Sequence, residues 1–343
     1  MINLQIILPK LSQFYFHLSA FIPVFNQKQL QKSLLHQRKE RQAGRNGRSK
    51  AMRVKECFCP SSQEQALALL AELGDALQIC AGGTDLLVML RKGKTEAPFL
   101  MDISGLDLSG IREEEDHISI GALATLTDVQ ESPLLNKEPY RFLQRAAGWV
   151  GSPQIRNAAT LAGNLCTGIP SADTSTPLLA LDARVRLASV RRTREIPLTG
   201  FFLAPRKTAL EADEMVTEVL LPRFPSGDYR TEFRKVGTRK ELFISIFHIA
   251  SLLEMEGPLV KRARFAMGVM APVPVRLFRT EELLTGKSLT PALIDEALET
   301  MKTEVHPRTS RHASKEYRMM LAENLLHRFL TEPPEGAEEG NLC

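Results

Sequence analysis

The sequence predicts an α+β protein with two folded domains, and three observations favour this class. The chain has 343 residues, which is enough for two domains. Its C-terminal part has a block of strand-like runs followed by a block of helix-like runs. Its N-terminal part has two loops of small residues at 80–85 and 151–177. We expect domains at 52–226 and 229–331, because Pro, Ser and Gly follow one another between them.

The two ends differ from the body of the chain. Residues 1–51 contain nine of the 44 Lys and Arg residues but one of the 40 Asp and Glu residues, so the remainder is mildly acidic. We expect this basic extension to be disordered, and either a targeting or partner-binding segment or no part of the native protein, with translation starting at Met52. Residues 332–343 are expected to fray. A nucleic-acid-binding domain would carry its basic patch on the fold, so the charge excludes that class.

The cysteines and the hydropathy of the chain indicate in which compartment and in which class of protein it belongs. The five cysteines form no CxxC pair and no Cys/His ligand spacing, which argues against a disulfide framework, a zinc site or an iron–sulfur cluster held by this chain. We therefore expect a reducing, cytoplasmic setting. No apolar run approaches the roughly 20 residues of a membrane span.

The first domain is expected to begin with a helix after Ser62, where Ser62 and Gln65 have capping-box spacing and Gly74 can end the helix. A short strand then leads into the loop at 80–85. Further strands are expected at 99–103, 117–123, 184–188 and 195–198, and further helices at 85–92, 139–150 and 174–181. The last two strands form a hairpin.

The second domain is expected to be a sheet followed by helices. Strands are predicted at 233–236, 244–254 and 260–270, and the Gly257-Pro258 turn makes the last two an antiparallel hairpin. Helices are predicted at 276–284, 291–301 and 314–330.

The two small-residue loops are the candidate site. The stretch 151–177 has few large side chains, so it is poor core material but lets backbone approach a ligand closely. Residues 80–85 lie between a strand and a helix, a geometry that turns backbone N–H groups toward an anion. Either loop alone could be only a tight turn. Together they predict a phosphate-bearing cofactor held from both sides.

Both loops resemble motifs of the FAD-binding subunits of molybdenum hydroxylases, the xanthine dehydrogenase and carbon monoxide dehydrogenase flavoproteins. A Rossmann G-x-G-x-x-G motif and a P-loop are both absent. Residues 81–86, AGGTDL, match the first family motif, and 160–164, TLAGN, match the second, with Ala162 where the family often has Gly. The preceding PQIRN at 153–157 and the following Ser171-Ala172-Asp173 fit as well.

The resemblance extends through the second domain, so that it covers about 52–330. Phe233, Lys235 and Arg239 match, as do 268–276 and the segments 307–310 and 313–318. It is nearest to the bacterial xanthine dehydrogenase subunits. The implied fold is a vanillyl-alcohol-oxidase/PCMH-type FAD-binding domain followed by a carbon monoxide dehydrogenase flavoprotein C-terminal-like α+β domain.

The resemblance implies a set of FAD-binding residues, with no catalytic side chain and no metal ligand. In it, the N–H groups of the first motif hold the diphosphate, and Asp173, Leu220 and Lys235 contact the cofactor. Leu220 could instead be strand core, and Lys235 and Arg239 could be solvated charges. The implied residues are Gln78, Ile79, Cys80, Ala81, Gly82, Gly83, Thr84, Asp85, Leu86, Thr160, Leu161, Ala162, Gly163, Asn164, Thr167, Asp173, Leu220 and Lys235.

Three other residues are expected to be structural. Cys166 is expected to be a small packed side chain, His248 a satisfied core histidine, and Trp149 a packing residue at a helix end.

The resemblance implies an electron-transfer role within a hetero-oligomer. A molybdopterin-binding subunit would oxidise the substrate, an iron–sulfur subunit would carry the electrons to FAD, and NAD+ or oxygen would accept them. The alternatives are a stand-alone flavoprotein oxidoreductase that acts directly on a small substrate, and a nucleotide-binding scaffold without redox chemistry. No acid/base constellation stands out for the stand-alone enzyme, and flavin chemistry needs none from the protein.

Overall fold

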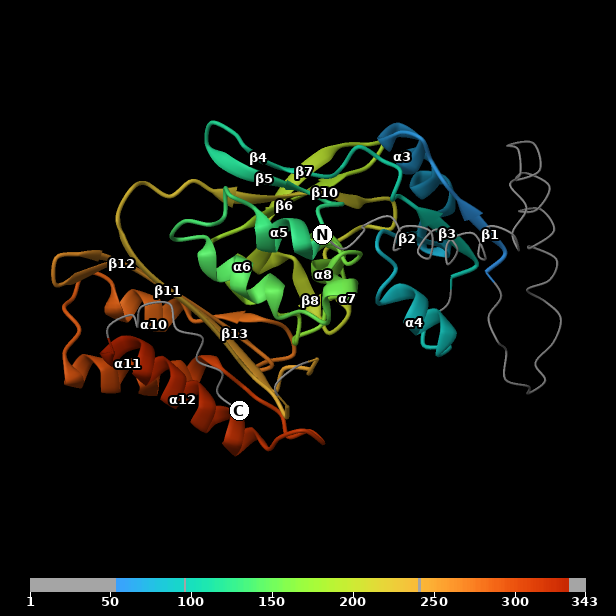
Figure 1. The fold of residues 1–343 in the computed structure, drawn as a ribbon. Coiled ribbons are helices and arrows are strands. Elements are labelled where there is room, and N and C mark those ends of the chain that lie inside the picture. Colours follow the sequence, from blue (N-terminus) through green and yellow to red (C-terminus); the bar gives the residue numbers. More distant parts are fainter. Residues whose placement is uncertain (1–53, 96, 240–241, 333–343) are drawn as a thin grey trace, which may run out of the picture.

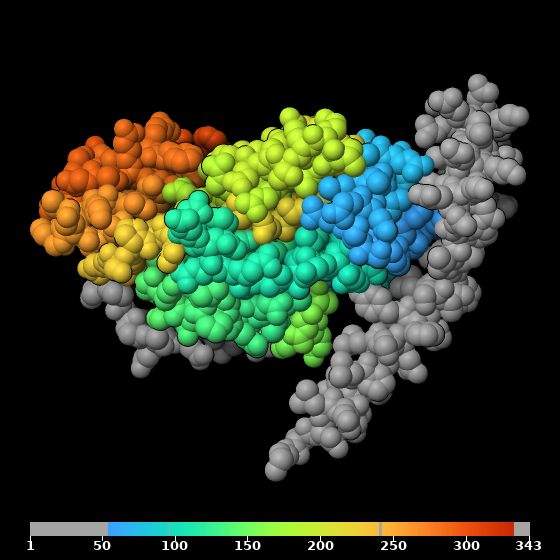
Figure 2. All heavy atoms as spheres, turned by 90° about the horizontal axis from the view of Figure 1, so that it is seen from above, coloured from blue at the N-terminus to red at the C-terminus, as the bar shows by residue number. Residues whose placement is uncertain are grey.

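A computed structural model describes residues 54–95, 97–239 and 242–332. The N-terminal extension at 1–51 and the tail, apart from Glu332, lie outside these residues, so the predictions made for them stay predictions. Figure 1 shows an elongated molecule with the first strands and helices at one end and the C-terminal helices at the other, and Figure 2 shows the same order along its surface.

The N-terminal end is a small parallel sheet of order β1-β3-β2. Its strands are β1 (Glu56–Phe58), β2 (Leu77–Cys80) and β3 (Phe99–Asp102), and its helices are α3 (Gln63–Leu73), η2 (Gly74–Ala76) and α4 (Leu86–Arg91). Ser62 caps α3 by accepting a hydrogen bond from the N–H of Gln65. The reciprocal half of the predicted capping box is shifted by one residue, because the Gln65 side chain accepts from the N–H of Ser61. Apolar residues of α3 and the three strands share one core.

The middle of the molecule is a five-stranded antiparallel sheet of order β4-β5-β10-β6-β7. Its strands are β4 (Ile111–Glu113), β5 (His117–Gly121), β6 (Arg184–Ala188), β7 (Thr193–Pro197) and β10 (Met215–Pro222). The predicted hairpin is present, with its second strand two residues earlier than expected. A short hairpin of β8 (Phe202–Ala204) and β9 (Lys207–Thr208) follows η3 (Leu198–Gly200). Val219 and Leu221 of β10 face the main core.

The stretch 151–177 is more helical than the predicted loop. It contains α7 (Pro153–Arg156), α8 (Leu161–Cys166) and the start of α9 (Ser175–Ala180). The side chains of Ser152 and Thr160 cap α7 and α8, which explains why helices form in a run of small residues. With α5 (Leu126–Glu131) and α6 (Arg141–Gly148), these helices pack against the central sheet.

The C-terminal domain is an antiparallel sheet of order β11-β12-β13-β14 with three helices on one face. Its elements are β11 (Asp228–Val236), β12 (Phe247–Glu256), β13 (Leu259–Gly268), β14 (Val275–Arg276), α10 (Phe278–Leu284), α11 (Pro291–Glu304) and α12 (Lys315–Thr331). Phe247, Ile249 and Leu253 pack against these helices, while Ala250 and Leu252 belong to the main core. Because both faces are covered, β12 is buried at almost every position.

The predicted α+β class is confirmed, and the predicted strands differ from the observed ones at their ends. The strand expected from 244 begins only at Phe247, and Ile244 is an exposed loop residue. β11 begins at Asp228, five residues before the expected start, so the predicted linker ends where this strand begins. Among the described residues, no helix is long and apolar enough to cross a membrane.

Candidate functional site

The two small-residue segments meet backbone to backbone. A Cβ added to Gly82 would lie 1.7 Å from the carbonyl oxygen of Ala158, the residue two before Thr160. Real side chains cannot approach that closely, so only glycine permits this contact. The two segments therefore lie in contact, as the prediction of one shared site requires.

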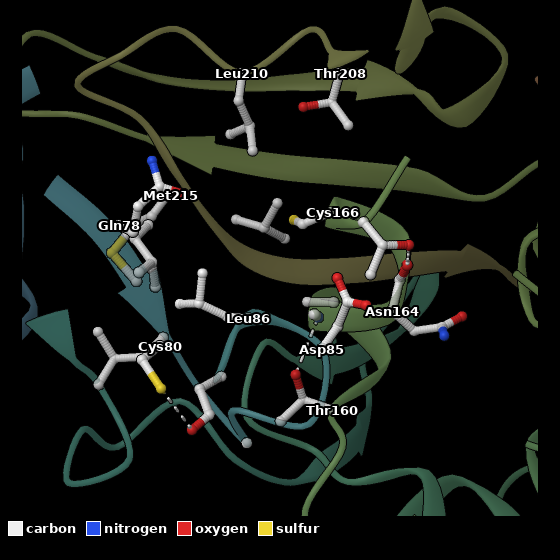
Figure 3. Close-up of a pocket in the computed structure, with 18 of the residues that line it drawn as sticks. Gln78, Cys80, Asp85, Leu86, Thr160, Asn164, Cys166, Thr208, Leu210 and Met215 are labelled. Carbon is white, nitrogen blue, oxygen red and sulfur yellow. Dashed lines mark hydrogen bonds between the residues drawn. The ribbon is translucent and has the colours of Figure 1, made fainter. Parts of the chain in front are cut away.

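A cavity of about 790 Å³ opens along these segments, within the size range of small-molecule sites. Figure 3 shows Gln78 and Met215 at one end of it and Thr160 and Asn164 at the other. Of the predicted residues, those lining it are Gln78, Ile79, Cys80, Ala81, Gly82, Gly83, Thr84, Asp85, Leu86, Thr160, Ala162, Gly163, Asn164 and Thr167.

The first motif offers a row of free backbone donors. Within the described part of the chain, the N–H groups of Gly82, Gly83, Thr84 and Asp85 donate to no protein acceptor. Gly83 has φ +68°, a left-handed conformation that glycine adopts without strain. Consecutive unpaired N–H groups beside a cavity suit an anion such as a diphosphate.

The second motif is held in place by its own hydroxyl groups. The Thr160 side chain accepts a hydrogen bond of 3.0 Å from the N–H of Gly163 and so caps α8. Thr174 donates to the Asn164 side-chain oxygen at 2.7 Å, and Thr167 donates to the Asn164 carbonyl at 2.7 Å. Ala162 lies inside α8 and is not among the residues with positive φ, so the replacement of the family's glycine causes no strain here.

The opposite wall of the cavity comes from residues 206–216, which no sequence motif indicated. Its anchor is Glu214, whose carboxylate accepts two hydrogen bonds of 2.7 Å from Arg194 and one from the N–H of Glu211. Burial raises the pKa of Glu214, but these hydrogen bonds outweigh it and lower the pKa overall. The only sequence signals were the turn residues Pro205-Arg206 and the apolar residues of β10.

Four predicted cofactor residues do not line this cavity: Leu161, Asp173, Leu220 and Lys235. Leu161 is part of the main core. Leu220 is buried in β10 between Ser119 and Arg184, its neighbours on the adjacent strands. Their predicted contacts with a cofactor remain proposals.

Asp173 and Lys235 instead form a buried cluster at the junction of the two domains. The Lys235 ammonium lies 2.6 Å from Asp173 Oδ2 and 3.0 Å from the Trp149 carbonyl oxygen. Ser245 donates to Asp173 Oδ1 at 2.6 Å, and the Phe243 ring lies 4.6 Å from the ammonium. The interpretation of Lys235 as a solvated charge is therefore wrong, because the strand carrying it is covered. Arg239, by contrast, is exposed.

Of the three residues expected to be structural, two match the expectation and one does not. His248 is fully buried and hydrogen-bonded to Thr176 and to the Pro170 carbonyl oxygen, as predicted. Trp149 follows the last residue of α6 and packs edge-on against Phe243, also as predicted. Cys166 is not a packed side chain: it is exposed and lines the cavity, because it lies at the cavity-facing end of α8.

Comparison with known proteins identifies the class to which this fold and site belong. A family model described as the FAD binding domain in molybdopterin dehydrogenase matches residues 50–224, and one described as the CO dehydrogenase flavoprotein C-terminal domain matches residues 232–333. The chain therefore belongs to the family of FAD-binding subunits of molybdenum hydroxylases.

Individual relatives are similar to this protein along most of their length and most of this chain. A xanthine dehydrogenase FAD-binding subunit of Escherichia coli O157:H7 is 33% identical over 269 residues, covering 78% of this chain and 91% of the relative. A nicotinate dehydrogenase FAD-subunit of Eubacterium barkeri is 34% identical over 291 residues, covering 83% and 98%. The structure of carbon monoxide dehydrogenase from Hydrogenophaga pseudoflava superposes with a TM-score of 0.75 at 29% identity, covering 80% of this chain and 94% of that one.

The residues present fit FAD, the cofactor of this family. The free N–H groups at 82–85 match a diphosphate, and apolar side chains line the cavity on either side of them, including Leu77, Ile79, Met89 and Met215. The cofactor, once bound, supplies the redox chemistry, and the protein binds and orients it.

Proposed function

We propose that this chain is the flavin subunit of a xanthine-dehydrogenase-type hydroxylase, which receives electrons from a partner iron–sulfur cluster and delivers them through FAD to NAD+. The observation that carries the proposal is the contact of Gly82 with Ala158, which joins the two motifs around a cavity with unpaired N–H donors. The xanthine dehydrogenase subunit named above supports the substrate class, although the nicotinate dehydrogenase subunit is about equally similar.

In this proposal the chain's own residues bind and orient the cofactor. The N–H groups of Gly82 to Asp85 donate to the diphosphate, and Thr160 and Asn164 close on it from the other segment. The Asp173–Lys235 pair holds the second domain at a fixed position beside the first, which sets the distance between the cofactor and whatever docks at that junction. No side chain is assigned a proton-transfer step.

Partner chains are part of the proposal. Several relatives are named as one chain of a larger enzyme, such as the medium chain of carbon monoxide dehydrogenase and the medium subunit of nicotine 6-hydroxylase. We propose that this chain likewise works as one subunit of several, together with a molybdopterin subunit and an iron–sulfur subunit, in the cytoplasm and with NAD+ as acceptor.

The test has two parts. First, the isolated full chain is mixed with NADH under anaerobic conditions, and the absorbance of oxidised flavin is followed. We expect bleaching by NADH and none by xanthine or nicotinate. Bleaching by a small organic substrate alone would support a stand-alone oxidoreductase, and bleaching by neither would exclude NAD+ as the acceptor.

Second, the complex purified through a tag on this chain is assayed with xanthine, nicotinate and carbon monoxide. Activity with nicotinate or carbon monoxide but not xanthine would overturn the substrate class.

A further inference from the structure

Arg206 lies at the edge of the cavity and forms an ion pair with the first FAD motif. Its guanidinium Nη1 is 3.3 Å from Asp85 Oδ2, a contact between residues 121 positions apart in the chain. Both side chains are half-exposed, and both residues line the cavity. The pair therefore spans from the opposite wall to the Gly82–Asp85 loop.

The backbone fixes where Arg206 begins. Its φ is +62°, in the left-handed region, and its N–H donates to the Gly168 carbonyl oxygen at 2.8 Å. A Cβ added to Gly168 would lie 3.0 Å from the Arg206 Cα, so the two backbones are in close contact just beyond α8. The turn between β8 and β9 thus contacts the backbone just after α8, while the Arg206 side chain reaches the first motif.

Charge gives this pair a role in cofactor binding. The unpaired N–H groups end at Asp85, whose carboxylate would repel a diphosphate bound there. Glu211 and Glu214, on the same wall as Arg206, already accept hydrogen bonds from Arg191, Arg192 and Arg194. Within the described residues, Arg206 is the one cation paired with Asp85. Lys94 and Lys207 also line the cavity, but removing Arg206 would leave the Asp85 carboxylate without its paired cation where the cofactor's own negative charge belongs.

We propose that Arg206 is a further residue of the FAD site: it offsets the charge of Asp85 and binds the diphosphate from the wall opposite the Gly82–Asp85 loop. This inference rests on the assignment of the cavity to FAD. It implies that Arg206 strengthens the binding of the cofactor's phosphate groups and not of its flavin ring.

The experiment measures dissociation constants of the full chain, freed of flavin, for FAD, ADP and riboflavin. We expect Arg206→Gln to weaken the binding of FAD and ADP about fivefold at low salt, the upper end expected of a partly exposed charged contact, and to change the binding of riboflavin less than about twofold. The difference should shrink at about 0.5 M salt, since the contact is exposed to screening. Adding Asp85→Asn to Arg206→Gln should recover only part of the FAD affinity, because the uncompensated carboxylate is then gone but the contact of Arg206 with the diphosphate is still missing.

Two further variants separate charge from folding. Arg206→Gly removes the same charge while favouring the left-handed backbone, so it should lose FAD affinity without losing thermal stability. Arg91→Gln, in the last turn of α4 and outside the cavity, removes one positive charge nearby and should bind FAD as the wild type does.

The possible results are distinct. Unchanged FAD and ADP affinity in both Arg206 variants would overturn the inference, and so would an equal loss for riboflavin, which has no phosphate. A wild-type chain that folds but binds none of the three would instead count against the FAD assignment itself.

Discussion

Lys235 of the second domain and Asp173 of the first form an ion pair with 2.6 Å between Nζ and Oδ2, although 62 residues separate them. Their side chains are 3% and 8% exposed. Three neighbours complete the cluster, the Trp149 carbonyl oxygen, the Ser245 hydroxyl and the Phe243 ring. Both charges are thus shielded from solvent, and each is stabilised mainly by the other.

Removing one partner of this pair should destabilise the fold strongly. Asp173→Asn leaves the Lys235 ammonium buried without an anion, which costs about 3–5 kcal/mol of the free energy of unfolding. Asp228→Asn, an exposed position on the same strand as Lys235, should change it by less than about 0.5 kcal/mol. Urea unfolding at neutral pH gives both values. A loss below about 1 kcal/mol for Asp173→Asn would show that the pair is not what joins the domains.

The buried His248 should make stability fall in mild acid. The Pro170 carbonyl oxygen can only accept, so Nε2 carries the proton and Nδ1 accepts from the Thr176 hydroxyl. Burial lowers the pKa of His248, with Lys235 adding to this and Asp173 opposing it. As the pH falls through about 6.5, His248 therefore becomes protonated in the unfolded chain but stays neutral in the folded chain.

The direction of the pH dependence of stability follows from this difference in the pKa of His248. Above about pH 6.5 both states are neutral at His248 and the group contributes no pH dependence, whereas below it stability drops by up to about 1.4 kcal/mol per pH unit. His248→Gln should be less stable at pH 7.5 but show a smaller decline between pH 6.5 and 5.5. Equal declines in both proteins would mean that His248 protonates without cost in the folded state.

The cofactor segments could be predicted from the sequence because their signal is local. A Cβ at Gly82 would clash with backbone, and at Gly83 and Gly163 it would crowd neighbouring side chains, and the motifs that contain these glycines are short and continuous. The helices of the second domain were predicted for the same reason, since apolar spacing and caps such as Ser314 lie within one segment.

The rest of the site depends on contacts between distant segments. Arg206 meets Asp85, and Lys235 meets Asp173, only after the sheets have formed, and no spacing in the chain encodes either pair. The burial of Lys235 comes from the packing of β11 against α6 and from the Phe243 ring over its ammonium, so its strand pattern alone suggested a solvated side chain. The helix α8 was missed because it is short and has Gly163 and Asn164, two poor helix formers, at its centre.

Thr160 offers a test of the second motif that separates its hydroxyl from its shape. Thr160→Val keeps the branched side chain but removes the hydrogen bond to the Gly163 N–H, which should cost about 1 kcal/mol of stability and weaken FAD binding. Thr160→Ser keeps the cap and should retain both. Thermal unfolding and flavin content per chain are the measurements. A loss in Thr160→Ser but not in Thr160→Val would show that the methyl group, not the cap, positions α8, and equal behaviour of the two variants would contradict the role of the cap.

Gly82→Ala should separate the two motifs and abolish the FAD site. The new Cβ would fall 1.7 Å from the Ala158 carbonyl oxygen, a backbone atom that cannot rotate away, so the two segments must move apart. Because the proposed FAD site uses both segments, we expect chains without flavin and a stability loss of about 1–3 kcal/mol. Gly105→Ala is the matched control: a Cβ there meets no atom within 4 Å, and its flavin content and stability should stay close to wild type. Wild-type flavin content in Gly82→Ala would contradict the contact that joins the two motifs, and with it the location of the cofactor.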